Sequence, residues 1–190
     1  MRNQVQFGLI MGFFFLICVM LFTITVEAQK CNPSGRVKGT QAPKDKCDPS
    51  VDDCCKANKF YTVFKCSPPV SGHTKAILTI NDFEKGGDGG GPSECDNKFH
   101  SNKIPVVALS TGWFNGRKRC HRNITIFGNG RSTKAMVVDE CDSTKGCDDD
   151  HGFQPPCRNH IVDASQAVWE ALKVPKDNWG EMDIFWADDN

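Results

Sequence analysis

The chain has 190 residues and a formal net charge of zero, from 23 basic and 23 acidic side chains. This balance gives no long-range field that would attract nucleic acid or an anionic membrane surface, so we expect neither as a partner. Hydrophobic residues make up 39% and charged residues 24% of the chain, which excludes a disordered or collagen-like polypeptide. The unusual feature is the 11 cysteines. That density is rare in a reducing cytosol and typical of disulfide-stapled proteins in an oxidising compartment.

Residues 1–28 are typical of a signal peptide. After Arg2, the run from residue 7 to residue 26 carries no charge, and Val26 and Ala28 place small side chains at the positions that a signal peptidase reads. We expect cleavage after Ala28 and a secreted, extracellular protein. The apolar run is also long enough to span a bilayer, so a retained signal-anchor remains the alternative.

The break at Ser67-Pro68-Pro69 divides the cysteines of the mature chain into two groups, each with an odd number of members. Removal of residues 1–28 takes away Cys18 and leaves ten cysteines, an even number. Five precede the break and five follow it, so at least one disulfide must join the two segments if all ten pair within one chain. The ten, whose pairing the spacing leaves open, are Cys31, Cys47, Cys54, Cys55, Cys66, Cys95, Cys120, Cys141, Cys147 and Cys157. We therefore expect residues 29–72 to form a cysteine-rich segment stapled to a second domain, residues 73–190.

A zinc site is the alternative use of the later cysteines, together with His151 and His160. Their spacings match no short paired-ligand pattern, and export favours oxidation, so disulfides are the better interpretation. We expect neither a metal nor a cofactor.

From residue 73 onward the hydrophobic pattern is mostly that of strands. Strands are predicted over residues 76–80, 104–109 and 182–187. The clearest hairpin joins residues 123–126 to residues 135–138 through Gly128-Asn129-Gly130, which tolerate positive φ. Many short strands predict a small closed barrel.

One short helix is predicted near the C-terminus. Asp163-Ala164-Ser165-Gln166 has the pattern of a capping box, with Asp163 as the N-cap. Apolar residues recur at helical spacing up to Leu172, and Pro175 limits extension beyond Val174.

Several motifs resemble known families. Residues 108–116, 137–141 and 162–165 resemble the double-psi β-barrels of barwin and expansins. Residues 31–35, 53–55, 66–70 and 86–95 are similar to the plant kiwellin family, also called ripening-related proteins, and this similarity covers nearly the whole mature chain. The resemblance implies a mainly β, disulfide-rich double-psi β-barrel with a cysteine-rich N-terminal appendage. It also implies a secreted plant protein linked to ripening and defence, some of whose relatives bind secreted fungal enzymes.

Asp139 and Asp163 match the two acidic residues of the expansin-like groove. A pair of carboxylates could serve as acid and base in glycoside hydrolysis. The structural alternative is that Asp163 caps the helix while Asp139 forms hydrogen bonds at a strand end. In expansins the matching motif is His-Phe-Asp, whereas here His160 lies three residues before Asp163. We therefore assign no catalytic residue.

Tryptophan and arginine residues are the candidates for contact with a partner. Trp169 and Trp186 are expected to pack inward, whereas Trp113 precedes a polar loop and is the better surface candidate. Arg117 and Arg119 lie in that loop, and Trp and Arg often dominate interface energy.

Asn123-Ile124-Thr125 is the only N-glycosylation sequon in the chain. Strand alternation directs Asn123 away from Ile124, so the asparagine could carry a glycan on the surface.

These patterns favour a monomeric, non-enzymatic defence protein of the plant apoplast that binds, and could inhibit, a secreted microbial (fungal) protein. The alternative is an expansin- or barwin-like protein that binds or cleaves cell-wall polysaccharide through Asp139, Asp163 and Trp113. After signal cleavage, no membrane association is expected.

Overall fold

The computed structural model describes residues 30–47, 53–87 and 90–189. The predicted signal peptide lies outside these residues. Within them, no helix has the length and apolar character needed to cross a membrane. Cys31–Asn190 form one compact unit.

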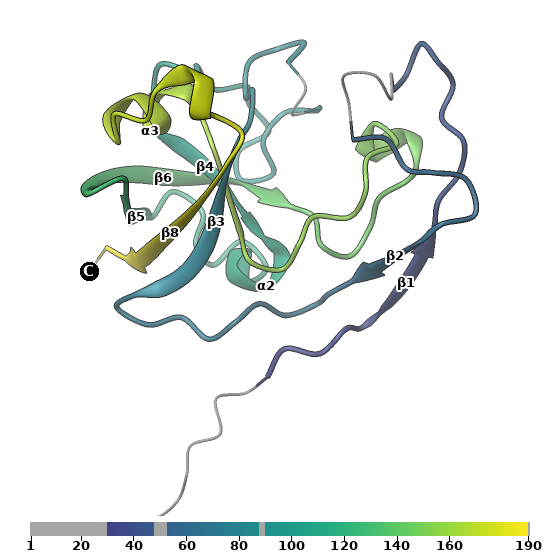
Figure 1. The fold of residues 1–190 in the computed structure, drawn as a ribbon, viewed down its shortest axis with the longest axis horizontal. Coiled ribbons are helices and arrows are strands. Elements are labelled where there is room, and N and C mark those ends of the chain that lie inside the picture. Colours follow the sequence, from purple (N-terminus) through teal and green to yellow (C-terminus); the bar gives the residue numbers. More distant parts are fainter. Residues whose placement is uncertain (1–29, 48–52, 88–89, 190) are drawn as a thin grey trace, which may run out of the picture. The chain divides into compact units, whose positions relative to one another are not determined.

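Six strands close into a barrel in the order β3-β7-β4-β6-β5-β8 (Figure 1). The strands β3 and β7 pair in parallel, as do β4 and β6, while the other neighbours are antiparallel. This confirms the mainly β, double-psi β-barrel class. The strand bounds are β3 (Thr74–Ile80), β4 (Val106–Ser110), β5 (Asn123–Gly128), β6 (Arg131–Cys141), β7 (Ile161–Ala164) and β8 (Glu181–Asp188).

The β5–β6 hairpin follows the sequence prediction closely. Gly128 pairs with Arg131 across a two-residue turn, in which Asn129 has φ 50° and Gly130 has φ 67°. Positive φ at both turn residues is the geometry whose twist matches that of the flanking strands. Along β5, Ile124 and Ile126 point into the core, while Asn123, Thr125 and Phe127 face outward.

The barrel interior is filled by aliphatic and indole side chains. Trp169 and Trp186 are fully buried, as predicted. The β4 strand is buried at every position, because its residues contribute to two clusters, one on each face of the sheet. Such a strand shows a continuous apolar run rather than alternation.

The helix content differs from the sequence prediction, which was a single helix near the C-terminus. The described residues contain two short α-helices, α2 (Thr111–Phe114) and α3 (Gln166–Ala171), and two 3-10 helices, η1 (Asp149–His151) and η2 (Lys176–Asn178). The strand β7, which ends at Ala164, occupies residues expected to begin the helix. Parallel pairing with β3 and antiparallel pairing with β4 hold these residues extended, so tertiary pairing overrides the local capping pattern.

The N-terminal segment contributes a two-stranded antiparallel sheet of β1 (Gly35–Lys38) and β2 (Phe60–Val63), which the sequence analysis missed. All ten expected cysteines are paired. The bridge that the odd counts required is Cys55–Cys147, and it joins this segment to the barrel domain. The other four disulfides are Cys31–Cys66, Cys47–Cys54, Cys95–Cys120 and Cys141–Cys157.

Candidate functional site

Asp139 and Asp163 come together at one groove of the barrel. Ala108 of β4 pairs with Asp139 of β6 on one side and with Asp163 of β7 on the other. A register shift after Val107 omits Val138 from the pairing and brings Asp139 opposite Ala108. Since neighbouring strands lie about 4.8 Å apart, the two aspartate Cα atoms are separated by roughly 10 Å. Both side chains line a cavity of about 220 Å³.

The Asp139 carboxylate ties two chain segments together. Its Oδ1 atom accepts hydrogen bonds from the backbone N–H groups of Glu94 and Glu140, both at 2.8 Å. Burial raises the pKa of Asp139, although these two hydrogen bonds oppose the rise. Asp139 therefore forms the hydrogen bonds at a strand end that its structural interpretation predicted. Its carboxyl group also holds its proton more tightly than an exposed aspartic acid does.

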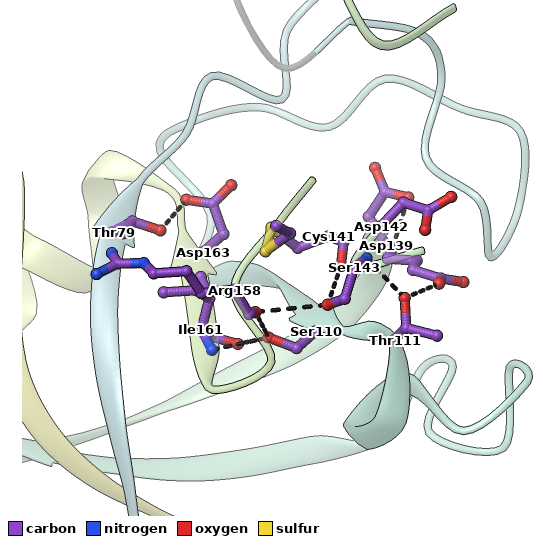
Figure 2. Close-up of a disulfide and its surroundings, with 12 residues drawn as sticks. Thr79, Ser110, Thr111, Asp139, Cys141, Asp142, Ser143, Arg158, Ile161 and Asp163 are labelled. Atoms are coloured by element: carbon purple, nitrogen blue, oxygen red, sulfur yellow. Dashed lines mark hydrogen bonds between the residues drawn. A yellow bond between two sulfur atoms is a disulfide. The ribbon is translucent and has the colours of Figure 1, made fainter. Parts of the chain in front are cut away.

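Asp163 does not cap the helix, and this part of the prediction is wrong. It lies within β7, where its carboxylate accepts a hydrogen bond from the Thr79 hydroxyl of β3 (Figure 2). The N-cap residue of α3 is Ser165, whose hydroxyl forms no cap bond. It donates instead to Ile104 O at 2.8 Å and accepts from Val106 N at 3.2 Å.

Further acidic side chains surround Asp139 in the groove. Burial raises the pKa of Glu140, and the Thr111 hydroxyl donates to Glu140 Oε1 at 2.5 Å. Burial would likewise raise the pKa of Asp142, but hydrogen bonds from Thr144 and from the backbone N–H of Lys145 lower it overall.

One wall of the groove is a loop held by disulfides. This loop, residues 142–157, is closed by Cys141–Cys157 and tied to the N-terminal segment by Cys55–Cys147. Within the loop, the imidazole of His151 lies 2.5 Å from Asp148 Oδ1 and 3.5 Å from Asp142 Oδ2. The cysteines considered as zinc ligands are thus oxidised. Within the described ranges, no group of three or more His, Cys, Asp or Glu side chains could hold a metal ion.

Buried hydroxyls anchor this loop to the barrel below the carboxylates (Figure 2). Ser110 Oγ donates to Arg158 O at 2.6 Å and accepts from Ile161 N at 2.7 Å. Ser143 N donates to Thr111 Oγ1 at 2.8 Å. The start of the loop is therefore fixed to α2, and the chain after it is fixed to β4.

Trp113 is buried, with 1% of its surface exposed, so its prediction as a surface residue is wrong. It lies on α2, and its Nε1 donates to Pro68 O at 2.8 Å. Its ring packs edge-on against Trp186 at 5.1 Å. The indole therefore joins the N-terminal segment to the barrel core and cannot contact a partner in this conformation.

Arg117 and Arg119, the two arginines of the predicted contact loop, differ in exposure and in their partners. Arg119 forms a bidentate pair with Asp188 at 2.8 and 2.9 Å and donates to Trp113 O. Arg117 is exposed and contacts Cys95 O at 3.0 Å and Glu94 Oε1 at 3.4 Å. Since Glu94 N also donates to Asp139, Arg117 borders the segment that Asp139 anchors. Arg117 thus remains a surface candidate, and Arg119 is structural.

Sequence reasoning missed the hydroxyl partners of the groove carboxylates, Thr79 and Thr111, and the adjacent acids Glu140 and Asp142. The run Asp139-Glu140-Cys141-Asp142 directly after a buried strand was a usable signal for the acids. No local pattern marks the threonines, because the barrel pairing brings them into place.

The family model described as Kiwellin-1 matches residues 18–189. The chain belongs to the kiwellin family. Kiwellin from Actinidia chinensis var. chinensis is 56% identical over 142 residues, which cover 74% of this chain and 66% of that protein. Ripening-related protein grip22 from Vitis vinifera is 56% identical over 146 residues, covering 76% and 66%. The chain thus spans about two thirds of the length of these two kiwellin-family relatives.

Among solved structures, the apo expansin of Clavibacter michiganensis aligns with a TM-score of 0.46 and 18% identity, over 62% of this chain and 50% of that one.

Proposed function

We propose that this kiwellin-family protein is secreted into the plant apoplast and there acts as a non-enzymatic defence protein that binds a secreted microbial protein. Family membership and the five disulfides support the proposal. Disulfides persist in oxidising compartments, which fits an extracellular location.

The observation that carries the proposal is the covalent fixing of the groove rim. Two disulfides hold the 142–157 loop, and Cys95–Cys120 ties the chain next to Glu94 to the loop that carries Arg117. A surface that is rigid before binding loses little conformational entropy when it contacts a folded partner. Exposed Lys145 lines the acidic groove, and exposed Arg117 contacts Glu94, whose backbone N–H donates to the groove residue Asp139. The groove and its surroundings therefore offer charges of both signs for recognition.

The hydrogen bonding of the carboxylates favours binding over turnover. Asp139 accepts from two backbone amides, and Asp163, Glu140 and Asp142 each accept from a threonine hydroxyl. Such bonds stabilise the loops and strands around the groove. A glycosidase acid and base must instead direct protons to and from a substrate oxygen and a water.

Capture from a fungal culture filtrate tests the proposal. Immobilised mature protein should retain at least one secreted fungal protein, and Arg117→Ala should weaken its affinity tenfold or more if the arginine is a dominant contact. Arg131→Ala is the matched control, because Arg131 is an exposed arginine at the opposite end of β6 from the groove. Equal retention of filtrate proteins by a heat-denatured sample would contradict the proposal.

A wall polysaccharide ligand is the second candidate, favoured by the raised pKa of Asp139 in a cavity shared with Asp163. Incubation with insoluble plant and fungal wall material tests it. Release of soluble sugar that disappears in Asp139→Asn or Asp163→Asn would establish this function in place of the first.

A further inference from the structure

An aromatic patch lies on the outside of the barrel, away from the groove carboxylates. It consists of His73, Phe127 and Phe185. The His73 ring stacks on Phe127 with centroids 5.3 Å apart and lies 5.6 Å from Phe185. Phe185 has 44% of its surface exposed. A contiguous exposed apolar patch is a candidate contact surface.

The glycosylation sequon lies on the same outer face. Asn123 is exposed at the first position of β5, and the alternation of the strand directs Asn123, Thr125 and Phe127 to one side. Ile124 and Ile126, which lie between them, are buried in the core. Asn123 and Phe127 are therefore separated by about 13 Å along the strand.

Small side chains lie between the asparagine and the patch. Thr125 pairs with Ala187 of β8, and Phe127, two residues further along β5, pairs with Phe185. A shallow track thus leads from Asn123 over Thr125 and Ala187 to the rings. Charged groups border the start of the track, where Lys134 Nζ lies 2.7 Å from Asp189 Oδ2.

We propose that Asn123 carries an N-linked glycan whose core sugars lie over Thr125 and Ala187 and pack against the aromatic patch. The inference rests on the proposed export, because the glycan is added in the secretory pathway. Two N-acetylglucosamine residues and the first mannoses form a chain long enough to reach Phe127. The C–H face of a pyranose is apolar and flat and complements an aromatic ring, while its hydroxyls can bond to Lys134 and Asp189. The track fits this occupant because it begins at the attachment atom.

Occupancy is measured first, on the full chain secreted from cultured plant cells. Peptide N-glycosidase should lower the intact mass of the wild type and of Thr125→Ser, which keeps the sequon. It should leave Thr125→Ala and Asn123→Gln unchanged. Secreted, disulfide-bonded wild type without a glycan would overturn the inference and leave the proposed export standing. Wild type retained inside the cell without a glycan would overturn both.

Packing is then tested by comparing glycosylated and enzymatically deglycosylated samples. Loss of the glycan should lower the Tm of the wild type by about 2–4 °C, the shift expected for one or two ring contacts in a protein of this size. In Phe185→Thr, the Tm difference between the glycosylated and deglycosylated samples should be at most half of the wild-type difference. Phe60→Thr is the control, because Phe60 is an exposed phenylalanine of the separate β1–β2 sheet, and it should retain the full decrease.

The rate of enzymatic deglycosylation is a second measurement, which tests the packing even if Phe185→Thr folds poorly. The native wild type should lose its glycan to the enzyme several-fold more slowly than Phe127→Thr, whereas the two denatured proteins should react at equal rates. Equal native rates, or an equal Tm decrease in wild type and Phe185→Thr, would show that the glycan projects into solvent and would overturn the packing.

Discussion

Arg119 holds several partners at once. Its guanidinium pairs with both carboxylate oxygens of Asp188, donates to Trp113 O, and lies 5.5 Å from the centroid of the Trp186 ring. The same pair lowers the pKa of Asp188. A planar guanidinium suits this combination of bidentate pairing and stacking, which an ammonium group cannot reproduce.

We therefore expect Arg119→Ala to lower the free energy of unfolding by about 2 kcal/mol, because charge-assisted hydrogen bonds are lost beside the core. Arg119→Lys should be intermediate, since it keeps the charge and loses the fork. The exposed Arg117→Ala should change stability by less than about 0.5 kcal/mol. Urea denaturation of the three variants measures this, and equal losses for Arg117 and Arg119 would contradict the assignment.

The raised pKa of Asp139 predicts that the stability of the protein depends on pH. Its pKa is raised in the folded protein above the ordinary value of 3.8, so the native state binds the proton more tightly than the unfolded state. Its contribution to stability is therefore fully present below pH 3.8 and is lost as the pH rises through the raised pKa.

Asp139→Asn cannot ionise, and its amide oxygen can still accept from Glu94 N and Glu140 N. We expect this variant to become more stable relative to wild type as the pH is raised from 3 to 7. Denaturation at several pH values and constant ionic strength measures the difference. A difference that is flat or falls with pH would show that Asp139 is not held in its protonated form by burial.

At the scale of elements, short α2 is the joint between the N-terminal segment and the barrel. A Cβ atom added at Gly112 would lie 2.1 Å from Ser67 N and 2.4 Å from the carbonyl carbon of Cys66. The close approach to backbone atoms requires glycine, and it also brings Trp113 to Pro68 O. This joint was invisible in the sequence, where residues 111–114 have no helical periodicity.

Gly112→Ala should destabilise the protein by about 2 kcal/mol, because neither backbone segment can move without disturbing the core. Gly72→Ala is the matched control, since a Cβ atom there meets nothing within 4 Å. It should have no measurable cost. Thermal and chemical denaturation compare the two, and tolerance of alanine at residue 112 would show that the joint can open.

At the scale of the whole molecule, the disulfides determine which parts unfold together. Cys55–Cys147 links residues 92 apart in sequence, whereas Cys47–Cys54 links residues 7 apart. A longer closed loop restricts the unfolded chain more, so the first bridge should contribute about 2 kcal/mol more to stability than the second.

The paired variants Cys55→Ser/Cys147→Ser and Cys47→Ser/Cys54→Ser measure this difference under oxidising conditions. The first should also expose residues 30–66 to limited proteolysis while the barrel resists. Equal stability of the two variants would mean that noncovalent contacts such as Trp113 to Pro68 already hold the segment.

The sequence by itself determined the features that depend on neighbouring residues or on counting. Alternation fixed β3, β5 and β8, the Asn129-Gly130 turn set the hairpin, and the odd cysteine counts required the bridge between the segments. Trp169 and Trp186 were placed inward correctly, because core packing is the default for large apolar side chains.

Tertiary structure decided what depends on long-range pairing. The parallel contact with β3 converted Asp163 from an expected helix cap into a strand residue facing Thr79, and a register shift in β6 brought Asp139 into the same groove. Trp113 was drawn into the core because the N-terminal segment supplies Pro68 O as its hydrogen-bond acceptor, 45 residues away in sequence. Local propensity contributes about 1 kcal/mol or less per residue, so a buried side chain or a full strand pairing outweighs it.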